Sequence, residues 1–207
     1  MAQLFSVHPE NPQPRLLRQA AELLQRSGVL AVPTDSCYAL VCQLDDKAAA
    51  DALRRIRQLD DKQLLSLICR DLRELANYAR VDNAQFRLLK LGTPGPFTFI
   101  LEASKEVPRR LSHPQRKTIG LRVAAHPVVQ ALIDIHGAPL LATTLILPGE
   151  TEPLNDAQEI REALEHQVAG VIDAGACPGV PTTVIDLSHG QPELLRRGRG
   201  DPARLGL

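Results

Sequence analysis

Three short hydroxyl-bearing segments beside apolar runs are the first candidates for chemistry in this sequence. They are PTDS at 33–36, ATT at 142–144 and PTT at 181–183. Hydroxyls and free backbone N–H groups at strand ends can hold a phosphate or a carboxylate. Each segment also has a simpler explanation, because threonine favours strands, and Asp and Ser stabilise turns through local hydrogen bonds. The repetition of the pattern keeps an anion-binding interpretation open.

Arg122 is the second candidate, because it lies within the apolar stretch IGLRVA. A guanidinium buried without an anion is costly. Either an internal carboxylate or the anionic group of a ligand must therefore pair with Arg122, and the sequence does not choose between them. The hypothesis of a ligand pocket rests on the second alternative. An internal Asp or Glu partner would remove that basis.

The remaining basic residues gather in three groups. These are Arg54, Arg55 and Arg57 with Lys62; Arg109, Arg110, Arg116 and Lys117; and Arg196, Arg197, Arg199 and Arg204. Such groups are usually solvated faces, yet arginines gathered on one side would suit a nucleic-acid backbone.

Several other chemistries lack their sequence patterns. No Walker-type or G-x-S-x-G motif occurs. The four cysteines form no C-x-x-C pair and His-rich spacing is absent, so we expect no metal site. A catalytic cysteine needs a lowered pKa, and no sequence feature indicates one for Cys37. Two Tyr, four Phe and no Trp argue against base stacking on several aromatic platforms.

Composition indicates an ordinary globular chain. Its 207 residues are 44% hydrophobic and 23% charged, and 24 basic residues balance 24 acidic ones. This length and balance predict a single domain over 1–207 with a core that needs no disulfide. With no signal peptide and no long apolar run, we expect a cytoplasmic protein with reduced thiols and no membrane partner.

Apolar periodicity predicts the elements that must position these residues. Helices are expected within 15–28, 46–59, 70–79, 83–92, 126–137 and 157–168. Asp46 and Asp71 are predicted N-caps, and His126 is a predicted substitute cap before Pro127. Strands are expected within 29–32, 64–69, 93–104, 118–125, 139–147, 169–175, 182–187 and 193–198, with a further strand-like stretch after the PTDS turn. Several strands follow one another without a helix, which favours an α/β domain with a mixed sheet over a doubly wound fold.

The motifs together resemble one family. The segments VPTDSCYALVC (32–42), TPGPFTFIL (93–101), TIGLRVAAHPVVQAL (118–132), PLLATTL (139–145), PTTVIDL (181–187) and LLRRG (194–198) occur in the order and spacing of the YrdC/YciO family. That family includes the threonylcarbamoyl-AMP synthases. The resemblance covers about 28–198, and RIRQL, CRDL, VDNAQFRL, KEVPRRL and KTIG are similar to the YciO branch rather than to the synthases.

The resemblance implies a twisted mixed sheet, flanked by helices, with a concave basic cleft. There the synthases bind ATP, L-threonine and bicarbonate, release pyrophosphate, and make an adenylate for tRNA threonylcarbamoyladenosine. ATP with Mg²⁺ is thus a possible substrate, and tRNA or double-stranded RNA is an expected partner beside a small anionic ligand. By the same resemblance, Ser36 would contact threonine, Arg122 would grip its carboxylate and Thr182 would assist. The residues expected to approach ATP are Thr118, Thr143, Thr144 and Arg196.

The chain departs from the K-x-R…S-x-N signature of the synthases. It carries Arg57-Gln58-Leu59 and Thr144-Leu145-Ile146 at these positions, and Ile68 where the pattern often has His. Arg57 and Thr144 keep a charge and a hydroxyl and are the candidate catalytic residues, whereas Leu59 and Ile146 remove polar groups. Losing one donor to a transferring group can cost about 2.7–4 kcal/mol. We therefore expect the cleft to persist in a poor synthase.

Three functions remain open at this point. The first is an enzyme of threonylcarbamoyl or adenylate chemistry, and the second is a noncatalytic protein that binds structured RNA. The third is a small-molecule binding or regulatory protein whose ligand the sequence does not name.

Overall fold

One large mixed sheet organises the chain in the computed structural model, which describes residues 1–60, 63 and 65–207. Lys62, and Leu64 at the start of a predicted strand, lie outside the described residues. The strands are β1 (Gln3–Ser6), β2 (Leu30–Val32), β3 (Ala39–Gln43), β4 (Ser66–Ile68), β5 (Phe97–Glu102), β6 (Thr118–Arg122), β7 (Leu140–Thr144), β8 (Gly170–Asp173), β9 (Thr183–Asp186) and β10 (Glu193–Arg196). The helices are α1 (Pro14–Gln25), α2 (Lys47–Arg57), α3 (Leu72–Tyr78), α4 (Asn83–Gly92), α5 (Pro127–His136), α6 (Ala157–Ala163) and the short 3₁₀ helix η1 (Pro202–Leu205).

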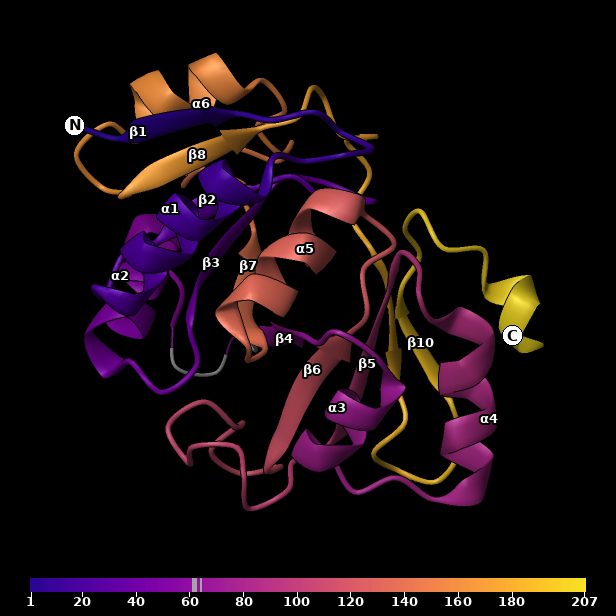
Figure 1. The fold of residues 1–207 in the computed structure, drawn as a ribbon. Helices are drawn as coiled ribbons and strands as arrows, with labels where there is room; N and C mark the ends of the chain where they lie inside the picture. Colours follow the sequence, from indigo (N-terminus) through magenta and orange to yellow (C-terminus); the bar gives the residue numbers. More distant parts are fainter. Residues whose placement is uncertain (61–62, 64) are drawn as a thin grey trace.

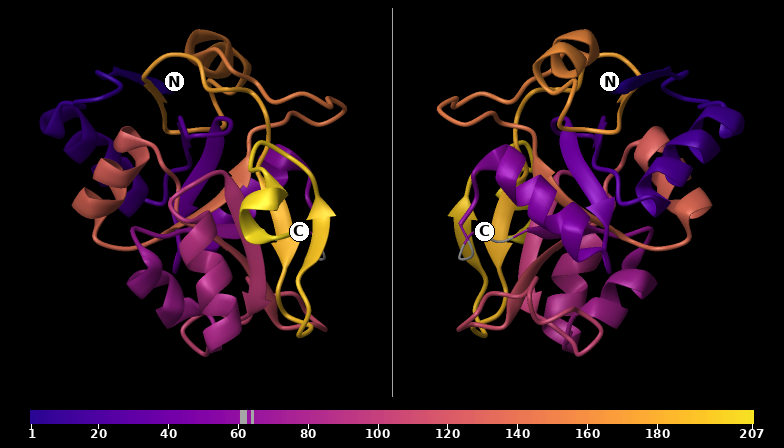
Figure 2. Two further views of the ribbon diagram at one scale, coloured as in Figure 1. Left: turned by 90° about the vertical axis from the view of Figure 1, so that its right-hand side faces the viewer. Right: turned by 90° about the vertical axis from the view of Figure 1, so that its left-hand side faces the viewer.

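The sheet contains both parallel and antiparallel pairs. Its strand order is β1-β8-β2-β3-β7-β4-β6-β5-β9-β10. The pairs β1·β8, β2·β8, β4·β6 and β5·β9 are parallel, and the other neighbours are antiparallel. The expected α/β domain with a mixed sheet is therefore confirmed. Figure 2 places the β9–β10 pair at one side of the molecule.

Two apolar clusters pack on opposite faces of this sheet. The smaller one joins α1 and α5, which contact each other, to the strands around β2, β3 and β8 (Figure 1). The larger one contains buried residues of α2, α3, α4 and α6 and extends along the sheet to β9. Burial of these leucines, isoleucines and valines, each contributing about 1.5–3 kcal/mol, holds the layers together.

Side chains on the central strands alternate between the larger cluster and the opposite face. Leu67, Phe99, Leu121, Leu141 and Ile185 face the cluster. Their neighbours Ser66, Thr98, Gly120, Ala142 and Val184 line a cavity on the other face. Small or hydroxylated side chains predominate on this part of the face, and Ile100 and Val184 add apolar surface. The period-two alternation of strands thus puts an apolar core behind a polar cavity.

Most predicted elements are confirmed, with shorter bounds for the strands. Asp46 accepts a hydrogen bond from the Ala49 N–H at 2.9 Å, and Asp71 accepts one from Glu74 at 2.8 Å. His126 Nδ1 accepts one from the Val128 N–H at 3.3 Å, so the three predicted caps are present. β1 was not predicted.

No helix in the described part of the chain combines the length and the apolar character needed to cross a membrane.

Candidate functional site

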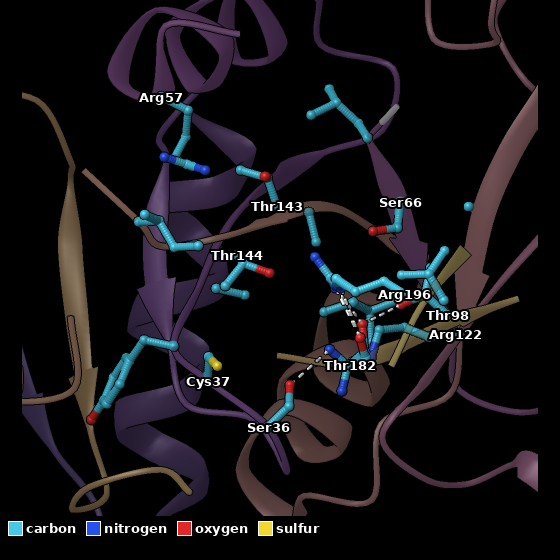
Figure 3. Close-up of a pocket in the computed structure, with 18 of the residues that line it drawn as sticks. Ser36, Cys37, Arg57, Ser66, Thr98, Arg122, Thr143, Thr144, Thr182 and Arg196 are labelled. Atoms are coloured by element: carbon cyan, nitrogen blue, oxygen red, sulfur yellow. Dashed lines mark hydrogen bonds between the residues drawn. The ribbon is translucent and has the colours of Figure 1, made fainter. Parts of the chain in front are cut away.

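A cavity of about 200 Å³ opens on the polar face of the central strands (Figure 3). Its floor is a row of residues that the strand register places side by side: Ala142 pairs with Ser66, Ser66 with Gly120, and Gly120 with Ile100. A Cβ atom on Gly120 would lie 3.2 Å from both the Ser66 Cβ and the Thr98 Cγ2. Glycine inside a strand often marks a close approach of a ligand. Here the missing side chain of Gly120 leaves space at the floor of the cavity.

The PTDS turn forms one wall of the cavity. Thr34 holds the turn: its hydroxyl donates to the Cys37 carbonyl at 2.6 Å and accepts from the Ser36 and Cys37 N–H groups at 3.2 and 3.3 Å. This frame turns Ser36 toward the cavity and Asp35 toward Arg122. The turn therefore serves both purposes that the sequence allowed, local stabilisation and a polar wall.

Arg122 has an internal partner, which corrects the basis of the pocket hypothesis. Its Nη2 donates to Asp35 Oδ1, and its Nη1 donates to Ser36 Oγ at 3.3 Å. Both side chains of the ion pair are nearly buried, at 8% and 11% exposure. Burial lowers the pKa of Arg122, and the Asp35 carboxylate opposes that shift. Of the two alternatives left open by the sequence, the internal carboxylate is the one present, so Arg122 does not need an anion from outside the protein, although its guanidinium does line the cavity.

Two other guanidiniums in the cavity have no carboxylate partner within the described ranges. Arg57 stands at the end of α2, on the opposite side of the cavity from Arg122 and Arg196 (Figure 3). Its Nε is buried and has no hydrogen-bond partner in the part of the chain that the structure describes, and the same holds for the Nε of Arg122. Partial burial lowers the pKa of both Arg57 and Arg196. With Arg122 neutralised by Asp35, these two side chains give the cavity its positive charge.

The far wall is a small network of hydroxyls around Arg196. Its Nε and Nη2 donate to the Thr182 carbonyl at 3.1 and 2.9 Å, and Nη2 also reaches Thr182 Oγ1 at 3.3 Å. The hydroxyls of Thr98 and Thr182 lie 2.8 Å apart. These contacts fix the guanidinium with its charge still uncompensated.

Cys37 also lines the cavity, but it is not an activated nucleophile. Burial raises the pKa of its thiol to about 11, against the opposing charges of Arg122 and Arg196. Thiolate is the reactive form, so this thiol is protonated at neutral pH.

Seven of the eight predicted site residues come together here. Ser36, Arg57, Arg122, Thr143, Thr144, Thr182 and Arg196 all line the cavity. Thr118 does not: it begins β6 on the same face as Gly120 and Arg122 but lies outside the cavity, and its buried hydroxyl has no partner among the described residues. Sequence reasoning missed Ser66, Thr98 and Gly120. Their signal was small or hydroxylated residues alternating with large apolar ones.

The two apolar replacements in the signature lie beside Arg57. Ile146 lines the main cavity, and both Leu59 and Ile146 line an adjoining hollow with Arg57. Ile68 contributes a further apolar wall. The structure therefore gathers Leu59 and Ile146 at the Arg57 end of the site, whereas Ile68 is paired in register with Arg122.

A second groove, of about 380 Å³, has mainly basic charged residues in its lining. It runs between α2 and the loop before β6 and is lined in part by Lys47, Arg54, Arg109 and Arg110. One acidic residue, Asp51, lines it too and pairs with Lys47 at 3.0 Å. Two of the three arginine groups noted in the sequence thus meet at this groove.

Comparison with known proteins agrees with this architecture. Residues 22–198 match the Sua5/YciO/YrdC family, which carries the description Telomere recombination. The chain is 50% identical to the YciO protein of Escherichia coli K12 over 201 residues, covering 97% of this chain and 98% of that protein. A Haemophilus influenzae protein is 49% identical over 204 residues, covering 98% and 99%.

Solved structures show the same fold. The crystal structure of E. coli YciO superposes with a TM-score of 0.96 at 49% identity, covering 99% of this chain and 100% of that one. Sua5 of P. abyssi, crystallised in complex with L-threonine, superposes with a TM-score of 0.87 at 26% identity. That match covers 94% of this chain and 57% of the Sua5 chain.

Proposed function

Because the chain belongs to the Sua5/YciO/YrdC family, we propose that its cavity binds a small anionic ligand of the threonylcarbamoyl-adenylate kind. The protein would then act in chemistry related to tRNA threonylcarbamoyladenosine, with synthesis of the adenylate itself weak. The observation that carries the proposal is the cavity lining, where three guanidiniums and the hydroxyls of six Ser and Thr residues converge.

The lining suits carboxylate or phosphate oxygens. Arginine offers a planar fork of donors that matches both groups, and hydroxyls complete their hydrogen bonds. The Nε groups of Arg57 and Arg122 are buried and have no hydrogen-bond acceptor among the described residues. A partly desolvated site of this kind attracts anions more strongly than an exposed arginine does.

The size of the cavity limits what it holds in this form. Sites for drug-sized ligands usually occupy about 300–1,000 Å³. A cavity of about 200 Å³ encloses an amino-acid-sized group or a short phosphate chain, with the rest of a nucleotide outside. Mg²⁺ would enter with the phosphates of ATP, because this lining offers hydroxyls rather than the carboxylates that the ion prefers.

The apolar residues near Arg57 argue for weak synthesis. Leu59 and Ile146 replace polar residues of the synthase pattern, and each lost donor can cost about 2.7–4 kcal/mol of transition-state stabilisation. Binding of the ligand needs only the retained arginines and hydroxyls. We therefore propose that the protein keeps its affinity for the anionic ligand while its rate of adenylate synthesis is reduced.

Two measurements test this function. Thermal shifts with ATP, AMP, L-threonine and tRNA identify a ligand, since a hundredfold excess over Kd adds about 2.7 kcal/mol of stability. Pyrophosphate release from ATP, L-threonine and bicarbonate measures synthesis, and Arg122→Ala should abolish whatever release there is. Absence of any anion-dependent shift would refute ligand binding, and release at the rate of a true synthase would refute the proposed loss of activity.

The basic groove supports a second candidate, the binding of tRNA or double-stranded RNA. Phosphate contacts from Arg54 and Arg109 would make affinity fall steeply with salt, because each neutralised phosphate releases counterions. Arg54→Gln and Arg109→Gln should each reduce the slope of log affinity against log salt by about 1, and Arg26→Gln on exposed α1 surface is the control. Binding that is absent or insensitive to salt would eliminate this candidate.

A further inference from the structure

We propose that the outer edge of β10, the side away from β9, is a surface for self-association, where a second copy of this chain adds its own β10 as an antiparallel neighbour. This inference goes beyond the proposed function and does not depend on what the cavity binds. The two copies are related by a two-fold axis, so one patch must be complementary to itself.

The outer edge of β10 is open. β10 ends the strand order, and none of the described strands pairs with it on this side. All of its residues, Glu193–Arg196, are exposed. An edge of this kind presents unpaired N–H and C=O groups that another strand can bind.

Exposed apolar side chains gather on the same side of the molecule. Within the described residues, the exposed large apolar side chains are those of Met1, Phe86, Leu91, Val180, Leu194, Leu195 and Leu207. Five of these seven belong to α4, to β10 or to the C-terminal end, which lie together on one side (Figure 1 and Figure 2). Apolar residues gathered in this way mark interaction sites more often than single exposed ones do.

The irregular register of β10 places two opposite charges on one face. Along β9, the pair position after that of Leu194 belongs to Arg196, so Leu195 is the extra residue of a β-bulge. Without the bulge, the strict alternation of a strand would put Glu193 and Arg196 on opposite faces. With it, both lie on the face of the sheet that carries the cavity, as their partner strand residue Val184 does.

A two-fold axis at Leu194 makes this order of residues complementary to itself. Leu194 then lies opposite Leu194 of the second copy, and Glu193 lies opposite Arg196 of the second copy, once on each side of the axis. Cross-strand pairs of opposite charge and of apolar side chains stabilise antiparallel strands, whereas like charges are destabilising. Arg196 has hydrogen bonds to Thr182 but no carboxylate partner among the described residues, so Glu193 would face an uncompensated charge.

The contact is expected to be weak and reversible. One short edge strand buries less than the roughly 1,200 Å² that a stable interface needs. Sedimentation equilibrium of the full chain between about 5 and 500 µM should therefore show monomers and dimers in exchange.

Charge reversal tests the register. Glu193→Arg sets like charges opposite each other at both ends of the contact, so dimerisation should weaken about tenfold or more, and Arg196→Glu should have the same effect. The double variant Glu193→Arg/Arg196→Glu restores opposite charges and should regain the dimer. Leu194→Lys should prevent dimerisation, because two lysines then meet at the axis.

Matched controls lie on the exposed surface of α1. Glu22→Arg and Arg26→Glu make the same charge changes away from β10 and should dimerise as the unmodified protein does. Circular dichroism and thermal unfolding establish that each variant is folded.

Three results would overturn the inference. The first is a protein that stays monomeric over the whole concentration range. The second is a dimer that Glu193→Arg and Leu194→Lys leave unchanged, because the contact then lies elsewhere. The third is loss of the dimer in both single charge variants without recovery in the double variant, because Glu193 and Arg196 then do not face each other.

Discussion

The ion pair between Asp35 and Arg122 makes a sharp prediction for stability. Asp35→Ala leaves a guanidinium that is only 8% exposed without its carboxylate, and it also removes the acceptor of the Ala125 N–H. Breaking a buried pair on one side costs about 3–5 kcal/mol. For a chain of this size that corresponds to a melting temperature lower by about 6–20 °C. Urea unfolding of the two proteins gives the free energy directly.

A double-mutant cycle distinguishes the pair from the packing of its atoms. Removing both charges in Asp35→Ala/Arg122→Met should cost less than the sum of the single variants, by about 0.5–3 kcal/mol. The control is Asp51→Ala, whose exposed pair with Lys47 is worth only about 0.2–1 kcal/mol. A loss below about 1 kcal/mol in Asp35→Ala, or strict additivity in the cycle, would refute the reasoning.

Three further predictions concern the floor of the cavity, the cap of α5 and the thiols. Gly120→Ala places a methyl group 3.2 Å from side chains of two neighbouring strands and fills part of the cavity floor, so calorimetry should show weaker binding of inorganic pyrophosphate. Unchanged affinity would exclude this floor from the site. Burial lowers the pKa of His126 from 6.5, so stability due to the neutral cap is complete above that pH and declines below it. His126→Asn keeps a cap acceptor and should reduce the loss of unfolding free energy between pH 7.5 and 5.5; an identical slope contradicts the assignment. Burial raises the pKa of Cys37 to about 11 and all four cysteines are buried, so a disulfide reagent at pH 7.5 should react only on unfolding, and a fast native phase would contradict this.

Local signals in the sequence predicted the helices well. The caps Asp46, Asp71 and His126 act on backbone groups two or three residues away, so their chemistry is visible in a short stretch. β1 was missed because it pairs with β8, more than 160 residues later in the chain. The sequence near Gln3 contains no local pattern that indicates this pairing.

The sequence predicted most of the residues that line the cavity but not the ion pair between Asp35 and Arg122. The resemblance to a family identified seven residues that line the cavity, whereas Thr118, two residues before Gly120 on β6, lies outside that lining. Asp35 was interpreted only as a turn former. Its role as the partner of Arg122 depends on a contact across 87 positions of sequence, which no local pattern encodes.

The position of β10 has a consequence for how a guest molecule reaches the interior. All four of its residues are exposed, β9 is its one partner among the described strands, and its register is irregular between Leu194 and Arg196. A strand held in this way opens at low free energy, well before the central strands do. The wall that carries Arg196 is thus an edge of the sheet. We expect a ligand to enter and leave where β10 separates locally from β9. Hydrogen exchange of the β10 amides should therefore slow when a ligand fills the cavity.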